Sequence, residues 1–187
     1  APSSLLFYLG FDKKLKNLTH HNLFFDTDFN LHSKEIYKDP KWPSKPLFYA
    51  NFTSMTNNRT APEGCENGFI LVPIAPDLED NEVLREKYFN IVIDRIENIT
   101  KQTIKENIIY KKSFCVNDFV GEYNSYKGNA YGLANTLLQT SFLRPKLKSS
   151  KVKNLFFTGQ LTVPGPGVPP SIISGKLVAD LIDNTNL

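Results

Sequence analysis

The chain has 187 residues, of which 41% are hydrophobic, and carries a net charge of +3. This length supports one globular core, or one domain together with a piece of another. The mild charge, without a basic run, speaks against a nucleic-acid partner, and no apolar stretch approaches the roughly 20 residues of a membrane-spanning helix. Cys65 and Cys115 form no metal-binding pattern, so no metal is expected, and two free thiols are typical of the reducing cytoplasm.

The first third of the chain predicts short strands around one helix. Residues 4–10 are apolar and aromatic and end at a glycine, which predicts a buried strand. Residues 29–38 predict a short helix that Pro40 stops, and residues 54–67, rich in Asn, Thr and Gly, predict a loop. Three more segments have a strand-like composition: residues 22–26, 46–52 and 68–74.

A long helix is predicted from Asp80, as its N-cap, to about Thr100. Apolar residues recur along this segment at spacings of three and four, which predicts one apolar stripe for packing. The members of the stripe are Leu84, Tyr88, Ile91, Val92, Ile96 and Ile99.

The following segment returns to strand-like and polar sequence. Residues 107–115 predict a strand, a polar loop with Gly121, Gly128 and Gly132 follows, and residues 133–142 predict a short helical turn or coil. Strands, a long helix and then more strands, without an internal repeat, predict an α+β fold with an antiparallel or mixed sheet.

The C-terminal segment differs in style. Residues 154–159 predict a compact buried strand, residues 162–170 a loop rich in Pro and Gly, and residues 171–183 a helix. The apolar side of this helix consists of Ile172, Ile173, Leu177, Val178 and Leu181. Strand, loop and helix together look like one βα unit that belongs to a different sheet.

This loop has the composition of a ligand-binding connection. Gly165 and Gly167 lack a Cβ, so backbone N–H groups can come close to a ligand, and four prolines stiffen the chain around them. Free N–H groups at a helix start favour a negatively charged or electron-rich group. An ordinary stiff connection between a strand and a helix has the same pattern, and the residues alone leave both interpretations open.

The segment resembles the C-terminal flavin motif of the phytoene and carotenoid desaturase family, within the larger group that includes the amine oxidases. Members of that family have a strand ending in Gly, a Thr-x-Pro-Gly-x-Gly-x-Pro loop, and a helix. The matching residues are Thr162, Pro164, Gly165, Gly167 and Pro169. Pro170 departs from the pattern, because the family often has a second glycine there.

Other segments also resemble this family. Residues 3–10 look like a family strand, residues 20–25 like its His-His segment, and residues 61–65 like the Ala-Pro-x-Gly segment before its Val-Pro strand. Further matches are Val72, Pro73, Asp118, Phe119, Gly128, Ala130, Gln139, Arg144 and Pro145. The resemblance therefore covers most of the chain.

The resemblance implies FAD as cofactor. The residues that it places against the flavin ring, ribityl chain and pyrophosphate are Gly159, Gln160, Thr162, Pro164, Gly165, Gly167, Val168 and Pro169. The Gly-x-Gly-x-x-Gly fingerprint that holds the adenosine end of FAD does not occur in this chain. The resemblance thus implies half of a flavin site, and we expect the chain to be a fragment that lacks the N-terminal half of the same protein.

The resemblance also implies two domains with different functions, and an enzymatic activity. Residues 1–145 would be a portion of the substrate-binding domain, and residues 146–187 would complete a Rossmann-like FAD domain. The intact protein would introduce C=C bonds into a carotenoid or other polyene by hydride transfer to flavin. The fragment alone would be inactive, and no residue is assignable as the catalytic base.

Several polar residues have two interpretations. Arg144 either stabilises a reduced, anionic flavin or forms a surface ion pair. His20 and His21 are either acid–base groups or structural residues at a strand edge. Asn57 stands where the family often carries an acid, near the substrate or flavin, and an amide cannot exchange a proton near neutral pH. Glu63 is expected to be a loop residue.

A stretch from residue 29 to residue 48 combines aromatic and basic side chains, which suits the headgroup boundary of a membrane. The residues are Tyr37, Trp42, Phe48, Lys34, Lys38, Lys41 and Lys45. A polyene dissolves in the bilayer, so we expect a cytoplasmic protein that is peripheral at the membrane. A solvated amphipathic helix and loop is the alternative.

Two other functions remain open. One is another flavin enzyme of the superfamily, such as a carotenoid oxygenase, an isomerase or an amine oxidase. The other is a non-catalytic module that binds a hydrophobic ligand or a partner protein.

Overall fold

The computed structural model describes residues 1–134 and 136–184. The chain divides into two compact units, the sheet unit, Pro2–Asn129, and the C-terminal unit, which begins at Ala130. The boundary predicted at residue 145 separates substrate-binding from flavin-binding parts and stays a prediction.

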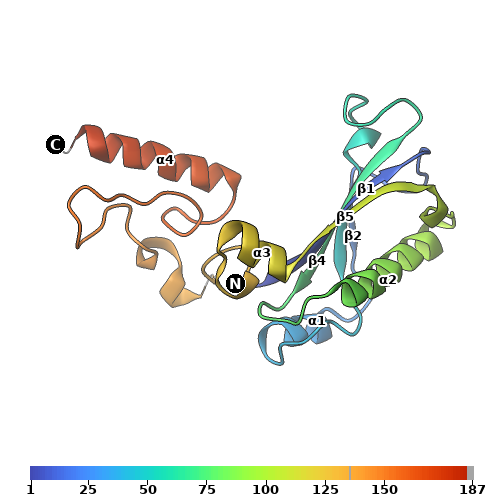
Figure 1. The fold of residues 1–187 in the computed structure, drawn as a ribbon, viewed down its shortest axis with the longest axis horizontal. Coiled ribbons are helices and arrows are strands. Elements are labelled where there is room, and N and C mark those ends of the chain that lie inside the picture. The colour runs from blue at the N-terminus through green and yellow to red at the C-terminus, as the bar shows by residue number, and fades with distance from the viewer. Residues whose placement is uncertain (135, 185–187) are drawn as a thin grey trace. The chain divides into compact units, whose positions relative to one another are not determined.

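A five-stranded antiparallel sheet forms the centre of the sheet unit, with the strand order β2-β3-β4-β1-β5 (Figure 1). The long strands β1 (Ser3–Phe11) and β4 (Glu66–Ile74) pair with each other over their whole length. β5 (Ile108–Phe114) lies on the other side of β1, while β3 (Phe48–Asn51) and β2 (His21–Phe24) extend the sheet beyond β4. This sheet and its helices confirm the predicted α+β class.

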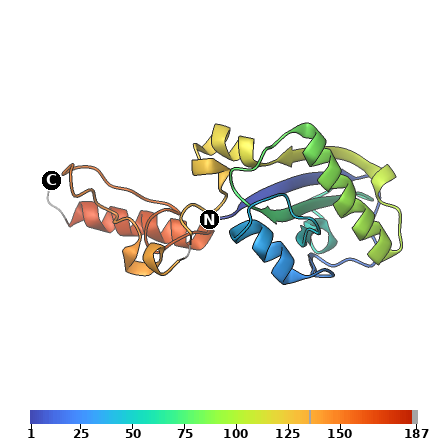
Figure 2. The ribbon, with the colours of Figure 1, turned by 90° about the horizontal axis from the view of Figure 1, so that it is seen from below.

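Two helices cover one side of the sheet. α1 (Phe29–Tyr37) begins after Asp28, whose side chain accepts a hydrogen bond from the first turn, and it ends before Pro40 as predicted. α2 (Glu82–Thr100) is the predicted long helix. Figure 1 shows α1 and α2 on the same side of the sheet, and Figure 2 shows them in front of it.

The core lies between the sheet and α2. Side chains alternate between the two faces of a strand, so every second residue of β1 and β4 points toward the helix. These buried residues are Leu5, Phe7, Leu9, Phe11, Ile70, Val72 and Ile74. The ring of Phe7 meets Phe89 of α2 edge to face, with centroids 5.3 Å apart.

The buried side of α2 differs in part from the predicted stripe. Tyr88, Val92 and Ile96 are buried as predicted, but Ile99 is 51% exposed. The other buried residues of the helix are Arg85, Phe89, Ile93 and Thr100. The side of α2 that packs against the sheet also includes polar side chains, which can be buried because they form hydrogen bonds. A search for apolar residues alone does not identify them.

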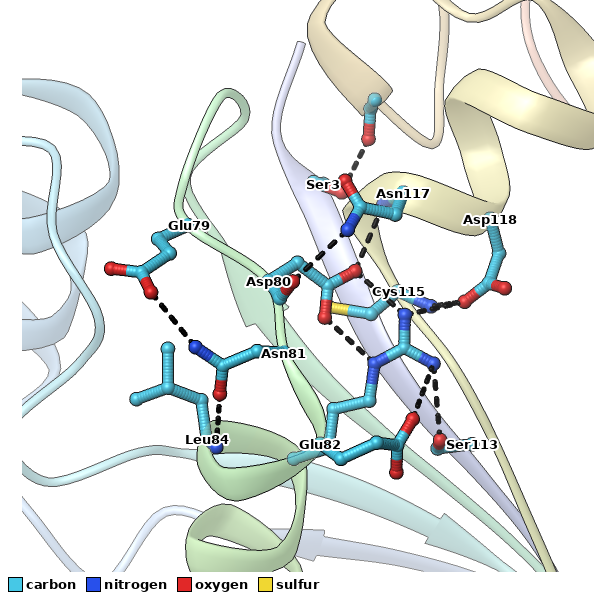
Figure 3. Close-up of polar contacts among 12 residues, drawn as sticks. Ser3, Glu79, Asp80, Asn81, Glu82, Leu84, Ser113, Cys115, Asn117 and Asp118 are labelled. Carbon is cyan, nitrogen blue, oxygen red and sulfur yellow. Dashed lines mark hydrogen bonds and ion pairs between the residues drawn. The ribbon is translucent and has the colours of Figure 1, made fainter.

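Asn81, and not the predicted Asp80, is the N-cap of α2. Its side chain accepts a hydrogen bond from the backbone N–H of Leu84, with a donor–acceptor distance of 2.9 Å. The Asp80 carboxylate instead accepts two hydrogen bonds of 2.7 Å from Arg85 (Figure 3). Prediction chose the wrong residue because both side chains are good caps, and only the tertiary partner of Asp80 separates them.

The same ion-pair network fixes α3 (Val116–Tyr123). A nitrogen of Arg85 lies 2.8 Å from a carboxylate oxygen of Asp118, and the backbone N–H of Asn117 donates to Asp80 at 2.9 Å. Burial would raise the pKa of Asp80, but these donors outweigh it and hold that pKa below its ordinary value. Gly121 therefore lies in a helix and not in the predicted loop.

Short 3-10 turns fill several connections. They are Thr53–Met55, Lys105–Asn107, Tyr126–Gly128, Leu137–Gln139 and Ser141–Leu143. Two of them agree with the turn or coil predicted over residues 133–142, of which residue 135 lies outside the described residues. Both cysteines are free, as predicted, and burial raises the pKa of the Cys115 thiol to about 12.

The buried strand predicted for residues 154–159 is wrong. Only an isolated bridge pairs Phe156 with Lys148, and Leu155 and Phe157 are exposed. A strand needs neighbouring strands for its backbone hydrogen bonds, and within the described part of the C-terminal unit no other strand pairs with this segment.

The last helix, α4 (Val168–Asp183), begins three residues before the predicted start. Pro169 and Pro170 lie in its first turn, where proline is tolerated because the N–H groups there have no intrahelical partner. Ser174 is the buried residue of this helix, and the side chains of Ile172, Ile173, Leu177 and Leu181 remain exposed.

Candidate functional site

The segment of residues 159–167, here called the glycine loop, has a backbone that requires glycine. Gly159, Gly165 and Gly167 have φ angles of +102°, +140° and +108°, values that other residues rarely adopt. The loop begins with a turn in which the hydroxyl of Thr162 donates to the carbonyl of Gly159 at 2.9 Å. The peptide bond between Val163 and Pro164 is cis.

Arg144 braces the glycine loop from a buried position. Its guanidinium donates to the carbonyl oxygens of Thr162 at 3.1 Å, Gln160 at 2.6 Å and Gln139 at 3.2 Å. The residue is only 3% exposed, which contradicts the surface ion pair considered as an alternative. A Cβ on Gly165 would lie 3.8 Å from the guanidinium carbon, so backbone and side chain are in close contact.

Ser174 ties α4 to the start of the loop. Its hydroxyl oxygen accepts a hydrogen bond from the backbone N–H of Gly159 at 2.8 Å and lies 2.8 Å from the hydroxyl of Thr158. The hydroxyl also donates to the carbonyl of Ser171 at 2.7 Å. Prediction missed this residue, although a serine at a core position of an apolar helix was an available signal.

The glycine loop presents backbone donors for a ligand. The N–H groups of Gly165, Gly167 and Val168 have no hydrogen-bond partner among the described residues. Pro169 and Pro170 have no N–H, so the helix start contributes a single donor from Val168 and not the several expected. An electron-rich group of limited size fits this set of donors.

The side of the sheet away from α2, here called the outer face, carries two rows of side chains set by the strand register. One row is His21, Asn51, Phe69, Tyr8 and Lys112. The next row is Leu23, Tyr49, Leu71, Leu6 and Phe114.

Aromatic rings dominate the middle of the outer face. The ring of Phe69 lies 5.4 Å from that of Tyr8 and 6.5 Å from that of Tyr49, measured between centroids. α3 covers one end, where Phe119 meets Phe114 at 4.8 Å. Toward β2 the first of the two rows becomes polar, with Asn51 and His21, while Leu23 ends the second row.

The two histidines lie at this polar end. Their rings stack with centroids 4.2 Å apart. Nδ1 of His21 lies 2.6 Å from the hydroxyl oxygen of Tyr49, and Nδ1 of His20 lies 2.6 Å from the hydroxyl oxygen of Thr56. Asn57 follows Thr56 in an exposed turn, where its side-chain oxygen accepts a hydrogen bond from the backbone N–H of Arg59 at 3.1 Å.

The aromatic side chains expected at a membrane boundary do not form one exposed set. Tyr37 is exposed, but Phe48 belongs to the core and is only 3% exposed. Trp42 packs on Tyr88 at 4.6 Å and donates its indole N–H to the carbonyl of Glu79 at 2.8 Å. Trp42 and Phe48 are therefore structural residues. Among the described residues, no helix is both long and apolar enough to cross a bilayer.

The chain is similar to known carotenoid-modifying enzymes. It is 42% identical over 182 residues to the carotenoid 3,4-desaturase of Haloarcula japonica, covering 97% of this chain and 37% of that protein. It is 33% identical over 187 residues to the 4,4'-diaponeurosporene oxygenase of Staphylococcus haemolyticus, covering 98% and 37%. It is 31% identical over 185 residues to the zeta-carotene-forming phytoene desaturase of Myxococcus xanthus, covering 95% and 35%.

These relatives are carotenoid desaturases and oxygenases, and the chain aligns with their C-terminal part. The chain belongs to the carotenoid and phytoene desaturase family. It spans little more than a third of the length of the relatives it matches. No protein-family model matches the chain.

Proposed function

We propose that the chain is the C-terminal part of an FAD-dependent carotenoid desaturase, which introduces C=C bonds into a polyene hydrocarbon. The observation that carries the proposal is the glycine loop, braced by Arg144 and leading into α4. The similarity to carotenoid desaturases over nearly the whole chain supports the same assignment.

The residues of the glycine loop fit a flavin nucleotide. Gly165, Gly167 and Val168 would donate backbone N–H groups to its oxygen atoms, because none of these three N–H groups has a hydrogen-bond partner among the described residues. The two glycines have no side chain that would keep the flavin away from the backbone. Bound FAD supplies a hydride acceptor for the C–H bond of the substrate. The hydroxyl–carbonyl bond of Thr162 and the three carbonyl contacts of Arg144 hold the loop in the shape that receives it.

Residues 146–187 would complete a Rossmann-like FAD domain, and residues 1–145 would belong to the substrate-binding domain. The exposed apolar side of α4 supports this division, because an apolar patch of that kind marks a surface that packs against another part of a protein. The remaining flavin contacts would come from the rest of the same protein.

The outer face would form one wall of a channel for the polyene. A hydrocarbon offers few polar groups, so its binding depends on apolar burial, at about 25 cal/mol per Å². Phe69, Tyr8, Leu71 and Leu6 provide such a surface across neighbouring strands. They would align the reacting C–H bond and keep water away from it.

The intact enzyme would be a cytoplasmic protein bound peripherally to the membrane that dissolves its substrate. Lys34 lies in the last turn of α1 and Lys38 follows the helix as its C-cap, and the ring of Tyr37 between them in sequence is exposed. Each lysine near an anionic surface contributes about 1 kcal/mol to binding. Trp42 and Phe48 have no part in this docking, because Trp42 packs on Tyr88 and Phe48 is buried in the core.

A second candidate within the same superfamily is a flavin enzyme that oxygenates the polyene. The 33% identity to a 4,4'-diaponeurosporene oxygenase favours it. The same loop would hold the flavin in both cases, and the chemistry of the product separates them.

The full-length protein tests the proposal. Purified enzyme should show flavin absorbance and convert a polyene to a product with a longer conjugated system, seen as a red shift. An oxygen-containing product would favour the oxygenase. Protein that folds without flavin and still binds polyene would instead be a non-catalytic binding module.

The Gly167→Val variant tests the loop itself. Its side chain would be strained at a φ of +108° and would crowd the N–H donors, so the variant should lose more flavin affinity than fold stability, measured as flavin content beside the thermal midpoint. The matched control is Gly121→Ala in α3, where an added Cβ meets nothing within 4 Å. Equal flavin content in both variants would contradict the role of the glycine loop.

A further inference from the structure

The positive charge of the chain is concentrated in the C-terminal unit. Residues 130–187 contain six lysines and arginines and two aspartates, which gives a net charge of +4. Residues 2–129 contain 16 basic and 17 acidic side chains, so the sheet unit has a net charge of −1. Four lysines lie between residues 146 and 153 with no acidic residue among them: Lys146, Lys148, Lys151 and Lys153. The mild charge of the whole chain therefore conceals one strongly basic segment.

Backbone hydrogen bonds fold this segment into a hairpin, residues 146–157, here called the basic hairpin. The N–H of Phe157 donates to the carbonyl of Leu147 at 2.8 Å, and the N–H of Ser149 donates to the carbonyl of Leu155 at 2.9 Å. The hydroxyl oxygen of Ser149 also accepts a hydrogen bond from the backbone N–H of Lys151 at 3.2 Å. The turn between residues 149 and 155 thus has a defined backbone, which holds its side chains in place.

The four lysines of the basic hairpin are available to a partner. Lys146 and Lys148 are two residues apart on one arm and share a side of it, opposite Leu147, which is buried. Lys151 and Lys153 are exposed at the turn. Within residues 1–134 and 136–184, no ion pair involves any of these lysines. Their charges are therefore not neutralised by acidic side chains in the described part of the chain.

Apolar side chains accompany the lysines at the turn. Val152 lies between two of them in sequence and is 47% exposed, and Leu155 is 42% exposed. Lysines beside exposed apolar side chains suit the boundary of a bilayer, where charged headgroups lie above acyl chains. A nucleic acid would favour arginine on its phosphates and aromatic rings for its bases, and residues 149–155 contain neither.

The lysines near α1 have a different environment. Residues 26–45 contain four lysines and four acidic residues. Lys41 lies 2.7 Å from a carboxylate oxygen of Asp39 and 3.9 Å from one of Glu35. Because an anionic surface repels the acids while it attracts the lysines, this stretch provides little net attraction. The basic hairpin therefore exceeds the α1 region as an electrostatic contact.

We propose that the basic hairpin docks the full-length enzyme on a bilayer that contains anionic lipid, with its four lysines at the headgroups and Val152 among the upper acyl chains. The inference rests on the proposed function, which places the enzyme at the membrane that dissolves its substrate. It adds the segment that contacts this membrane and the kind of lipid that the contact needs.

Sedimentation of the full-length protein with vesicles tests the docking. Vesicles of equimolar phosphatidylcholine and phosphatidylglycerol are compared with vesicles of phosphatidylcholine alone, at low salt and at about 1 M salt, where the Debye length is about 3 Å. One lysine near an anionic surface corresponds to about a fivefold change in partitioning. The quadruple Lys→Gln variant of the hairpin should therefore bind anionic vesicles roughly a hundredfold more weakly at low salt, and the difference should nearly vanish at high salt.

Two matched variants separate the basic hairpin from a general effect of net charge. The quadruple Lys→Arg variant of the hairpin retains the charge and should bind as the wild type does. A quadruple Lys→Gln variant of exposed positions in the sheet unit should lose less than about tenfold, because charges farther than a Debye length from the bilayer are largely screened. The exchanged residues of this control are Lys16, Lys87, Lys101 and Lys105. Thermal midpoints establish that the variants fold.

The apolar contribution has its own variant. Val152→Ser should weaken binding by roughly two- to fivefold at low and at high salt, because apolar burial is not screened by ions. The matched control is Val83→Ser in α2, where the valine is 80% exposed, and it should bind as the wild type does. Equal binding of the two variants would remove Val152 from the contact.

The outcomes separate this docking site from the proposed function, and flavin content measured on the same samples reports on that function independently. Equal wild-type binding to both kinds of vesicle, or binding that the hairpin Lys→Gln variant retains, would overturn the site and leave the proposed desaturase standing. Wild-type protein that sediments with neither vesicle would contradict the site and the peripheral location together. Lysine-dependent binding of single-stranded DNA without binding of vesicles would assign the hairpin to nucleic acid and overturn the site.

Discussion

The two units of this chain are stabilised in different ways. In the sheet unit, alternating apolar residues of β1 and β4 pack against Phe89 and Ile93 of α2, and many of these side chains are completely buried. In the C-terminal unit, the buried positions belong largely to polar side chains such as Arg144 and Thr162, and the apolar residues of α4 are exposed.

The difference between the two units shows that the interactions that stabilise a fold need not be those that define the shape of a loop. Apolar burial is the dominant favourable contribution to the stability of a domain, and the sheet unit has it within its own residues. A hydrogen bond contributes only about 1 kcal/mol net, so the bonds of Arg144 and Ser174 can define the shape of the glycine loop but supply little of the stability that a fold needs.

The largest effect is expected when the two units are produced separately. A polypeptide of residues 2–129 should unfold in one cooperative thermal transition, because its core is complete. Residues 130–187 should show no cooperative transition, since most of the apolar side chains of α4 are exposed and not part of a core. Circular dichroism melting curves measure both. A sharp transition in the shorter polypeptide would contradict the comparison.

Within the sheet unit, the ion-pair network should be the most sensitive point. Arg85→Met leaves the carboxylates of Asp80 and Asp118 without their cation, and a broken buried pair costs about 3–5 kcal/mol. The matched control is Arg59→Met at an exposed position, which should change the free energy of unfolding by less than about 0.5 kcal/mol. Urea unfolding of the chain measures both, and equal midpoints would show that the network is dispensable.

Two isoleucines of α2 test where the core ends. Ile93 is fully buried and Ile99 is half-exposed. Truncation to Ala should cost about 2–5 kcal/mol at position 93 and less than about 0.5 kcal/mol at position 99. A loss at Ile99 as large as that at Ile93 would mean that the contact side of α2 extends to Ile99, as the predicted stripe had it.

The stability of the sheet unit should depend on pH through His32. Burial holds the pKa of His32 below its ordinary value of 6.5, so the unfolded chain binds the proton more readily than the folded one. Its stabilising contribution is complete above pH 6.5 and falls as the pH drops below that value, by at most about 1.4 kcal/mol per pH unit for one proton.

The His32→Gln variant should be less stable at pH 7 and should lose this slope between pH 7 and pH 5. Its side chain cannot reproduce both hydrogen bonds of the imidazole, to Pro73 at 2.8 Å and from Leu47 at 3.0 Å. Guanidinium midpoints across that range decide the matter, and an unchanged slope would assign the titration to another group.

The smallest effect is a stabilisation. Gly121→Ala places a better helix former inside α3, in open space, and should add about 0.5–1 kcal/mol. Gly167→Ala should do the opposite in the C-terminal unit, because its φ of +108° strains any residue with a Cβ. A stability gain at both positions would remove the distinction between a helical glycine and a loop glycine.

Local pattern was sufficient for the elements whose signals lie within a few residues. Residues 4–10 form an apolar and aromatic run that ends at a glycine, and Pro40 stops the helix predicted for residues 29–38, so β1 and α1 occur close to where they were predicted. The loop rich in Pro and Gly that was predicted from residue 162 is also present, although α4 begins at Val168 and shortens it. The positive φ angles of Gly165 and Gly167 come from the structure. The family was recognisable from the same motif.

The tertiary structure alone decided which of two equivalent residues takes a role. Asp80 and Asn81 are equally good N-caps by residue type, but Asp80 is hydrogen-bonded to Arg85, and Asn81 therefore caps α2. Trp42 and Phe48 are residue types that suit a membrane anchor, but Trp42 packs on Tyr88 and Phe48 is buried in the core. Residues 154–159 have the composition of a strand, but a strand exists only where a neighbour supplies its hydrogen bonds. In each case the deciding partner lies elsewhere in space, where a local pattern carries no information about it.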